Sequence, residues 1–156
     1  MAPGYRELGD ETDLSLVQFP LRSTDKLRYA DTDRQGHVNN AVFATLFETG
    51  RVDLLYDETK PLREPGTAFV IARLAIDFHA EIVWPGAIDI GTRVARLGRS
   101  SIGLEQALFQ NGRCVAQAES VLVLMNEATR KSHPLSPQAI DCLARFMRSQ
   151  GGAAQS

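Results

Sequence analysis

Residues 28–40 read RYADTDRQGHVNN, a short polar stretch with apolar sequence on both sides. Two carboxylates, a glycine, a histidine and two asparagines are more polar chemistry than a surface turn requires. The sequence that follows, NAVFATLFETGRVDLLYDET (40–59), repeats apolar side chains at helical spacing and predicts a helix of roughly five turns. Asn39 or Asn40 can cap its start. An interior glycine costs a helix about 1 kcal/mol relative to alanine, so at Gly50 we expect close packing against a sheet.

On both sides of this helix the apolar residues change to a period near two, which indicates strands. One strand is predicted before the helix, at 21–30, and four longer ones after it, at 67–82, 87–98, 100–110 and 113–126. The sequence WPG at 84–86 and the pair Asn111-Gly112 mark two of the turns. A second helix is predicted at 136–150, with Ser136 as its cap and Pro137 in its first turn.

Consecutive strands with short connections form an antiparallel sheet, and one face of such a sheet must be covered. The long helix is the one predicted apolar element large enough to cover it, so the fold class is α+β. A chain of 156 residues fits a single domain. We expect that domain at 16–150, between a flexible N-terminal arm at 1–15 and a disordered tail at 151–156.

Composition excludes several classes of protein. The net charge of −2 and the pI of about 5.9 give no sign of a nucleic-acid partner. The N-terminus has no apolar signal segment, and the apolar runs are too short to span a bilayer, so we expect a cytoplasmic protein without membrane contact. Cys114 and Cys142 lack metal-ligand spacing and are expected to be reduced and structural. Neither a metal nor a cofactor is expected.

The polar stretch precedes the N-terminus of a helix that will be buried. The first turn of a helix has unpaired N–H groups and partial positive charge, which can stabilise an oxygen that becomes negative during a reaction. Gly36 lets the backbone turn tightly, and Asp31 or Asp33 can act as base or nucleophile. These are the groups that acyl transfer to water requires. A simple capping arrangement explains the same residue types, so both interpretations stay open.

The string YADTDRQGHVNNAVFATLFETGR (29–51) resembles hotdog-fold thioesterases of the 4-hydroxybenzoyl-CoA thioesterase type. That family shows a pattern close to R-Y-x-D-x-D-x-x-G-H-V-N-N, followed by aromatic residues and then E-x-x-R, and the likeness covers residues 20 to about 135. The resemblance implies a curved antiparallel sheet wrapped around one long helix. It also implies a homodimer or homotetramer with active sites at the subunit interface.

The resemblance also suggests roles for individual residues. Asp33 matches the catalytic aspartate, as nucleophile or general base, and a backbone N–H among residues 37–40 is expected to bind the thioester oxygen. The candidates around that oxygen are Gly36, His37, Val38, Asn39 and Asn40. His37 either orients substrate or water or is an ordinary structural histidine, and Asn39 and Asn40 can simply hold the loop and the cap.

Other positions carry weaker expectations. Glu48 is an alternative catalytic carboxylate, or it pairs with Arg51 at i,i+3 spacing. Asp31 is expected to be structural, as are His79 and His133. Many relatives have tyrosine where this chain has Phe43, so a hydroxyl is absent there.

Coenzyme A carries phosphates, which arginine binds well. The candidate CoA-binding residues are Arg96, Arg99, Ser100, Ser101, Arg130 and Lys131, although any single one of these charges can be a solvated surface residue. The acyl pocket is expected between the helix and the neighbouring subunit, with Phe47, Leu54 and Phe69 as candidate walls.

The leading hypothesis is therefore a hydrolase that converts an acyl-CoA or aroyl-CoA thioester into a free acid and CoA. A close variant would use an acyl carrier protein as the thiol carrier. A non-catalytic module that binds acyl-CoA, and a dehydratase or hydratase of the same fold, are the other classes to separate. The presence of Asp33 favours an enzyme over the binding module.

Overall fold

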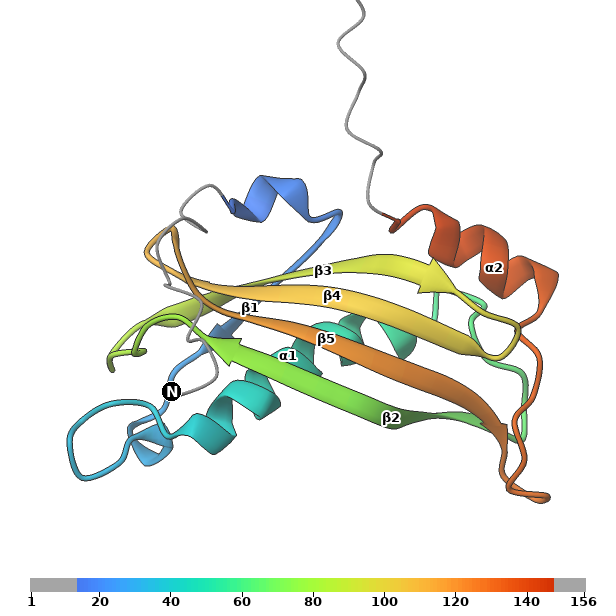
Figure 1. The fold of residues 1–156 in the computed structure, drawn as a ribbon, viewed down its shortest axis with the longest axis horizontal. Helices are drawn as coiled ribbons and strands as arrows, with labels where there is room; N and C mark the ends of the chain where they lie inside the picture. Colours follow the sequence, from blue (N-terminus) through green and yellow to red (C-terminus); the bar gives the residue numbers. More distant parts are fainter. Residues whose placement is uncertain (1–13, 148–156) are drawn as a thin grey trace, which may run out of the picture.

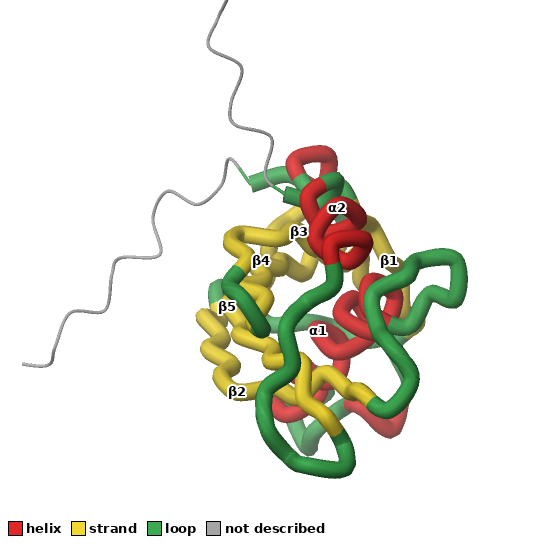
Figure 2. The backbone as a smooth tube through the Cα atoms, turned by 90° about the vertical axis from the view of Figure 1, so that its right-hand side faces the viewer, coloured by secondary structure: helices red, strands yellow, loops and turns green. Residues whose placement is uncertain are grey.

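The computed structural model of the chain describes residues 14–147, and residues 1–13 and 148–156 lie outside this range. Most of the predicted N-terminal arm and the whole predicted tail therefore fall outside the described residues. Within residues 14–147, a five-stranded antiparallel sheet curves around one long helix (Figures 1 and 2). This is the α+β architecture that the sequence predicts and the arrangement that the hotdog resemblance implies.

The sheet has the strand order β1-β3-β4-β5-β2. Its strands are β1 (Leu21–Lys26), β2 (Thr67–Phe78), β3 (Ala87–Leu97), β4 (Ser101–Gln110) and β5 (Arg113–Asn126). Consecutive strands β3, β4 and β5 pair as neighbours, as short connections require. Asn111 and Gly112 both have positive φ, 51° and 80°, which confirms the predicted hairpin turn.

Two predicted strands are shorter than expected. β1 ends at Lys26, and Tyr29–Asp31 form a single 3-10 turn instead of continuing the strand. β2 ends at Phe78 because the N–H groups of His79 and Ala80 both donate to the carbonyl of Val115, which turns the chain away from the ladder. Both corrections fall at the end of the sheet where the polar stretch lies.

The long helix, α1, runs over Asn40–Leu55, with Asn39 as its N-cap. The Asn39 side chain accepts a hydrogen bond from the N–H of Ala41 at 3.0 Å. The helix is shorter than the five turns expected from the apolar pattern. It stops because Asp57 folds the following residues into a turn, in which its carboxylate accepts from the N–H of Thr59.

Gly50 fixes α1 against the concave face of the sheet. A Cβ there would lie 2.7 Å from Gln106 Nε2, 2.7 Å from Thr92 Oγ1 and 2.8 Å from a methyl group of Ile90. The Gln106 amide donates to Thr92 Oγ1 and to the carbonyl of Phe47, so the helix is tied to β3 and β4 at the same place. The expected close packing at Gly50 is confirmed.

Helix α2 (Pro137–Ala144) begins with Ser136 as its cap and Pro137 in its first turn, as predicted, and ends before the expected residue 150. Its buried residues Ala139 and Leu143 join the core that includes Leu54 and Leu55 of α1. Cys114 and Cys142 are not joined in a disulfide. In the described part of the chain, no helix is both long enough and apolar enough to cross a membrane.

Candidate active site

The loop that carries Asp33 is a tight turn joined to the body of the protein at both ends. The Asp33 N–H donates to the carbonyl of His37 at 2.8 Å, and the Gly36 N–H donates back to the carbonyl of Asp33. Gly36 has a φ of 78°, a conformation that side chains rarely adopt. The glycine of the polar stretch is therefore required by the turn.

Asp33 uses one carboxylate oxygen to build this turn. Its Oδ1 accepts from the N–H of Gln35 at 2.8 Å and from the N–H of His37 at 3.3 Å. Its Oδ2 accepts no hydrogen bond from any described residue, and the side chain lies at the surface of a hollow. Asp33 thus combines a structural role with one free oxygen, so the two interpretations of the sequence are compatible.

The four backbone N–H groups at residues 37–40 differ in whether they have a hydrogen-bond acceptor. The N–H of His37 donates to Asp33, that of Val38 to the carbonyl of Ile82 at 2.9 Å, and that of Asn39 to the carbonyl of Asp31 at 2.9 Å. Only the N–H of Asn40, the first residue of α1, has no acceptor among the described residues. It carries the partial positive charge of a helix N-terminus.

Asp33 and Asn40 line the same hollow, which has a volume of about 390 Å³. Phe43 and Phe78 form an apolar wall, with their rings edge to face at 4.9 Å. The other lining residues are Gln35, His37, Val38, His79, Ala80 and Glu81. Asp33, which has a free carboxylate oxygen, and Asn40, which has an open N–H, therefore line one space together with an apolar wall.

His37 has a partner that sequence analysis did not identify. Its Nε2 lies 3.1 Å from Oε2 of Glu81, which is exposed at the rim of the same hollow. The isolated bridge between His37 and Val83 brings the two segments together. Phe78 and Glu81 lie 38 and 41 residues beyond Asn40, the end of the polar stretch, and no motif connects them to it.

Asp31 is buried and structural, as expected. Its carboxylate accepts from the backbone N–H of Arg28 at 2.8 Å and from the Arg28 guanidinium at 2.9 Å. Burial by itself raises the pKa of Asp31, but these hydrogen bonds and the charge of Arg28 outweigh burial and hold the pKa below its ordinary value. Asp31 therefore stabilises the base of the loop.

The predicted CoA-binding residues gather at the other end of the sheet. Arg96, Arg99, Ser100 and Ser101 lie at the β3–β4 turn, and Arg130 and Lys131 follow β5. Backbone hydrogen bonds from Leu124 to Ser100 and from Leu135 to Arg99 join the two groups. The hollow lies near Val115, and from there to Asn126 strand β5 spans roughly 35 Å. Figure 1 shows this separation between the loop before α1 and the far ends of β3 and β5.

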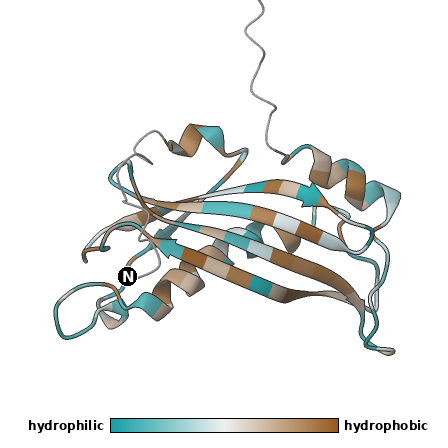
Figure 3. Cartoon of the chain, viewed as in Figure 1, coloured by the Kyte–Doolittle hydropathy of each residue, from teal (hydrophilic) through white to brown (hydrophobic). Residues whose placement is uncertain are grey.

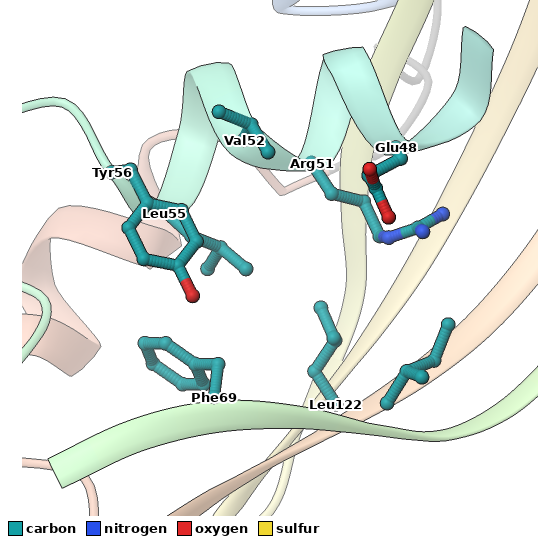
Figure 4. Close-up of a pocket in the computed structure, with 8 residues that line it drawn as sticks. Glu48, Arg51, Val52, Leu55, Tyr56, Phe69 and Leu122 are labelled. Carbon is teal, nitrogen blue, oxygen red and sulfur yellow. The ribbon is translucent and has the colours of Figure 1, made fainter. Parts of the chain in front are cut away.

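Glu48 and Arg51 also lie away from Asp33, on the second half of α1. They border a separate groove between α1 and strands β2 and β5 (Figure 4). The expected ion pair is not formed, since no hydrogen bond or salt bridge joins these two described residues, although their charges interact. Of the expected acyl-pocket residues, Phe69 lines this groove, whereas Phe47 and Leu54 are fully buried core.

Comparison with known proteins identifies the family. A model of the thioesterase-like superfamily matches residues 27–145, which is most of the chain. The chain belongs to this superfamily. The resemblance to hotdog-fold thioesterases is therefore confirmed, and with it the interpretation of the chain as an enzyme of this class.

Individual proteins that are similar to this chain support the same family assignment. The acyl-CoA thioesterase YbgC of Haemophilus influenzae is 30% identical over 104 residues, which cover 64% of this chain and 74% of that protein. Among solved structures, PA5185 of Pseudomonas aeruginosa has a TM-score of 0.77 at 26% identity, over 86% of this chain and 96% of that one. A Thermus thermophilus thioesterase, solved with coenzyme A and Zn, has a TM-score of 0.72 at 28% identity, over 83% of this chain and 95% of that one.

No group of three or more metal-ligating side chains exists among residues 14–147.

Proposed function

We propose that this thioesterase hydrolyses acyl-CoA thioesters, with Asp33 as the catalytic carboxylate and the Asn40 N–H as the oxyanion donor. The observation that carries the proposal is that Asp33, with its free carboxylate oxygen, and Asn40, with its open N–H, line one hollow. The names of the relatives, acyl-CoA thioesterase and acyl-CoA thioester hydrolase, support this substrate class.

Two routes lead from these groups to the products. If Asp33 attacks the thioester carbonyl, the C–S bond breaks, CoA thiol leaves and a mixed anhydride forms. Water then hydrolyses the anhydride to the free acid and restores the carboxylate. If Asp33 acts as a general base, it takes a proton from the attacking water and returns it to the departing thiolate. Turnover in ¹⁸O-water tests the first route, because attack of water on the aspartyl carbonyl of the anhydride places label in Asp33, whereas general-base catalysis places label only in the free acid.

In both routes the carbonyl oxygen gains negative charge when the tetrahedral intermediate forms. The Asn40 N–H at the start of α1 is oriented before the reaction, which is the condition under which such a donor lowers a barrier most. His37, held by Glu81, contributes a polar ring beside this oxygen and is proposed to orient substrate or water.

We also propose that a complete site needs two subunits. Strand β2 is an edge strand, and its side chains Val70, Ile71, Leu74 and Phe78 are apolar and exposed. Figure 3 shows the strand coloured hydrophobic over most of its length. An exposed apolar edge strand favours pairing with another chain. Antiparallel pairing of β2 with its own copy would bring the Phe78 end of one chain toward the Thr67 end of the other. The candidate CoA-binding residues of one subunit would then approach the hollow of its partner.

The first experiment compares the wild type with Asp33→Asn and with Asp141→Asn, an exposed aspartate on α2 that serves as a matched control. Thiol release is followed with short, medium and long acyl-CoAs and with benzoyl-CoA. We expect Asp33→Asn to lower kcat by about 10²–10⁴-fold on every good substrate and Asp141→Asn to leave it unchanged. Full activity of a folded Asp33→Asn would remove Asp33 from the mechanism. A uniform loss in Glu48→Gln instead would assign the chemistry to Glu48.

A mixing experiment tests the two-subunit site. Asp33→Asn is refolded together with Arg99→Ala/Arg130→Ala, each inactive by itself if the residues act as proposed. Mixed dimers would hold one intact site, and random association would restore roughly a quarter of the wild-type activity. No recovery, or a monomeric mass by light scattering, would contradict a site shared between subunits.

A further inference from the structure

A second cavity lies beneath the C-terminal half of α1, apart from the Asp33 hollow. It has a volume of about 470 Å³ and opens between the helix and strands β2 and β5. Most of its walls are apolar and come from Val52, Leu55, Phe69, Ile71 and Leu122. Figure 4 shows Tyr56 and Phe69 at one end of this groove and Glu48 and Arg51 at the other. The groove therefore has one apolar end and one charged end.

Arg51 is unusual because it is charged, buried and unpaired. The residue is only 7% exposed, and its Nη1 is buried without a hydrogen-bond partner. No carboxylate lies within salt-bridge distance of it among the described residues. Burial lowers its pKa, and the negative charge of Glu48 acts in the opposite direction. Because buried guanidinium groups are normally paired, this donor needs an acceptor that the described chain does not provide.

The negative charge of Glu48 near Arg51 selects the chemistry of that acceptor. A plain hydrocarbon chain would fill the groove but leave the Arg51 guanidinium without a hydrogen bond. A carboxylate would pair with Arg51 but be repelled by Glu48, which lies beside it. A hydroxyl group can accept from the guanidinium and donate to the carboxylate at the same time. The remainder of an aliphatic chain would then pack against the apolar walls.

We propose that this groove receives the acyl part of a thioester bound at the hollow of the partner subunit, because the proposed antiparallel pairing would bring Phe69 of one β2 toward the Phe78 end of the other. The groove then selects aliphatic acyl groups that carry a hydroxyl substituent. The inference rests on the proposed acyl-CoA hydrolysis and assigns Arg51 as a specificity-determining residue, with Glu48 as its co-ligand. A site built to hydrogen-bond a hydroxyl discriminates strongly against the analogue that lacks it, because its own polar groups are then left unpaired.

The test uses four CoA thioesters of equal chain length: octanoyl, 3-hydroxyoctanoyl, 8-hydroxyoctanoyl and the monothioester of octanedioic acid. At least one hydroxy form should have a kcat/KM about 10–100-fold above octanoyl-CoA. Arg51→Met, which retains an unbranched side chain of similar length, should reduce that ratio to within about threefold. Arg113→Met makes the same change at an exposed position on the β4–β5 hairpin and should leave the ratio and the octanoyl rate unchanged.

Glu48→Gln is a second variant at an exposed position, which keeps the test valid if Arg51→Met does not fold. The substitution removes the repulsion between Glu48 and the terminal carboxylate of the octanedioic monothioester. It should therefore raise kcat/KM for this compound several-fold relative to octanoyl-CoA. Three results would overturn the inference. The wild type could cleave octanoyl-CoA and both hydroxy forms at equal rates, or it could prefer the octanedioic form. The third is an Arg51→Met variant that keeps the wild-type preference for the hydroxy form.

Calorimetric binding separates failure of this inference from failure of the proposed function. Asp33→Asn should bind the preferred hydroxyoctanoyl-CoA about 10–100-fold more tightly than octanoyl-CoA, and adding Arg51→Met should abolish the difference. If the wild type releases no thiol while this difference persists, the hydrolase proposal fails and the groove assignment stands. If all four compounds bind Asp33→Asn equally, the groove assignment fails whatever the activity.

Discussion

At its N-terminus, α1 meets a loop held by a network of local hydrogen bonds, whereas its second half covers a guanidinium nitrogen that has no partner among the described residues. In the loop, Asp33 and Asp31 are held by local hydrogen bonds, while one Asp33 carboxylate oxygen and the Asn40 N–H have no partner among the described residues. In the groove, Arg51 is buried and its Nη1 has no acceptor within residues 14–147.

The difference suggests two distinct tasks. A preorganised loop with two free groups facing one space fits a step in which charge develops at a fixed position. A buried donor in an apolar groove fits recognition, because it gives a large penalty to any ligand that cannot satisfy it. We therefore separate chemistry at the start of α1 from selection along its second half.

The sharpest test of the first region removes the Asn40 N–H without removing the helix. Proline is favoured at the first position of a helix, and the extended backbone of Asn39 (φ −61°, ψ 139°) is compatible with a following proline. Asn40→Pro should lower kcat by about 10²–10³-fold, measured by thiol release. Asn40→Ala retains the N–H and should stay within a few-fold of the wild type. Similar losses in both variants would instead implicate the Asn40 side chain.

A change at Gly50 should affect both regions, because this residue sets the distance between α1 and the sheet. In Gly50→Ala the added methyl would lie within 2.8 Å of three side chains of β3 and β4. We expect a loss of about 1–3 kcal/mol in the free energy of unfolding, despite the better helix propensity of alanine. Chemical denaturation measures this loss, and a stabilised Gly50→Ala would contradict the close packing.

Asp31 makes the loop region sensitive to acid. Because its pKa in the folded chain is below the ordinary value of 3.8, folding favours the carboxylate form. This stabilisation is fully present above about pH 4 and is lost as the pH falls through the folded pKa. Asp31→Asn should cost about 1–2 kcal/mol at neutral pH and give a shallower decline of unfolding free energy below pH 4. Parallel acid titrations of the two proteins check this, and identical slopes would contradict it.

The smallest expected effect is in the groove, where a substitution at Arg51 should stabilise the protein slightly, whereas Gly50→Ala and Asp31→Asn should destabilise it. Arg51→Met removes a buried unpaired charge and keeps much of the packing, so the free energy of unfolding should stay equal or rise by about 1 kcal/mol. Thermal and chemical denaturation of Arg51→Met, with Arg113→Met as the control, measures this change in the free energy of unfolding. A loss of several kcal/mol would mean that Arg51 is a structural element of the core and would weaken the contrast between the two regions.

Much of the architecture could be predicted from local sequence. The alternation in 87–126 and the pair Asn111-Gly112 defined three consecutive strands, and Ser136-Pro137 defined the start of α2. The errors fell at element ends. Residues 27–31 and 79–82 continue a strand-like pattern, but hydrogen bonds to Arg28 and Val115 turn the backbone there. Such endings depend on partners that are distant in the sequence or on side-chain hydrogen bonds, which periodicity does not report.

In the candidate site too, some features depend on local sequence and others depend on remote segments. The sequence by itself determined the turn at Asp33 and Gly36, the cap at the start of α1 and the family, because these depend on residues within a few positions of one another. Only the tertiary structure decided that, in the described part of the chain, Asn40 has the one open N–H of residues 37–40 and Arg51 is buried without a partner. It also decided that Glu81 holds His37. Each of those facts depends on which groups of remote segments arrive within hydrogen-bonding distance, and only the folded sheet brings them there.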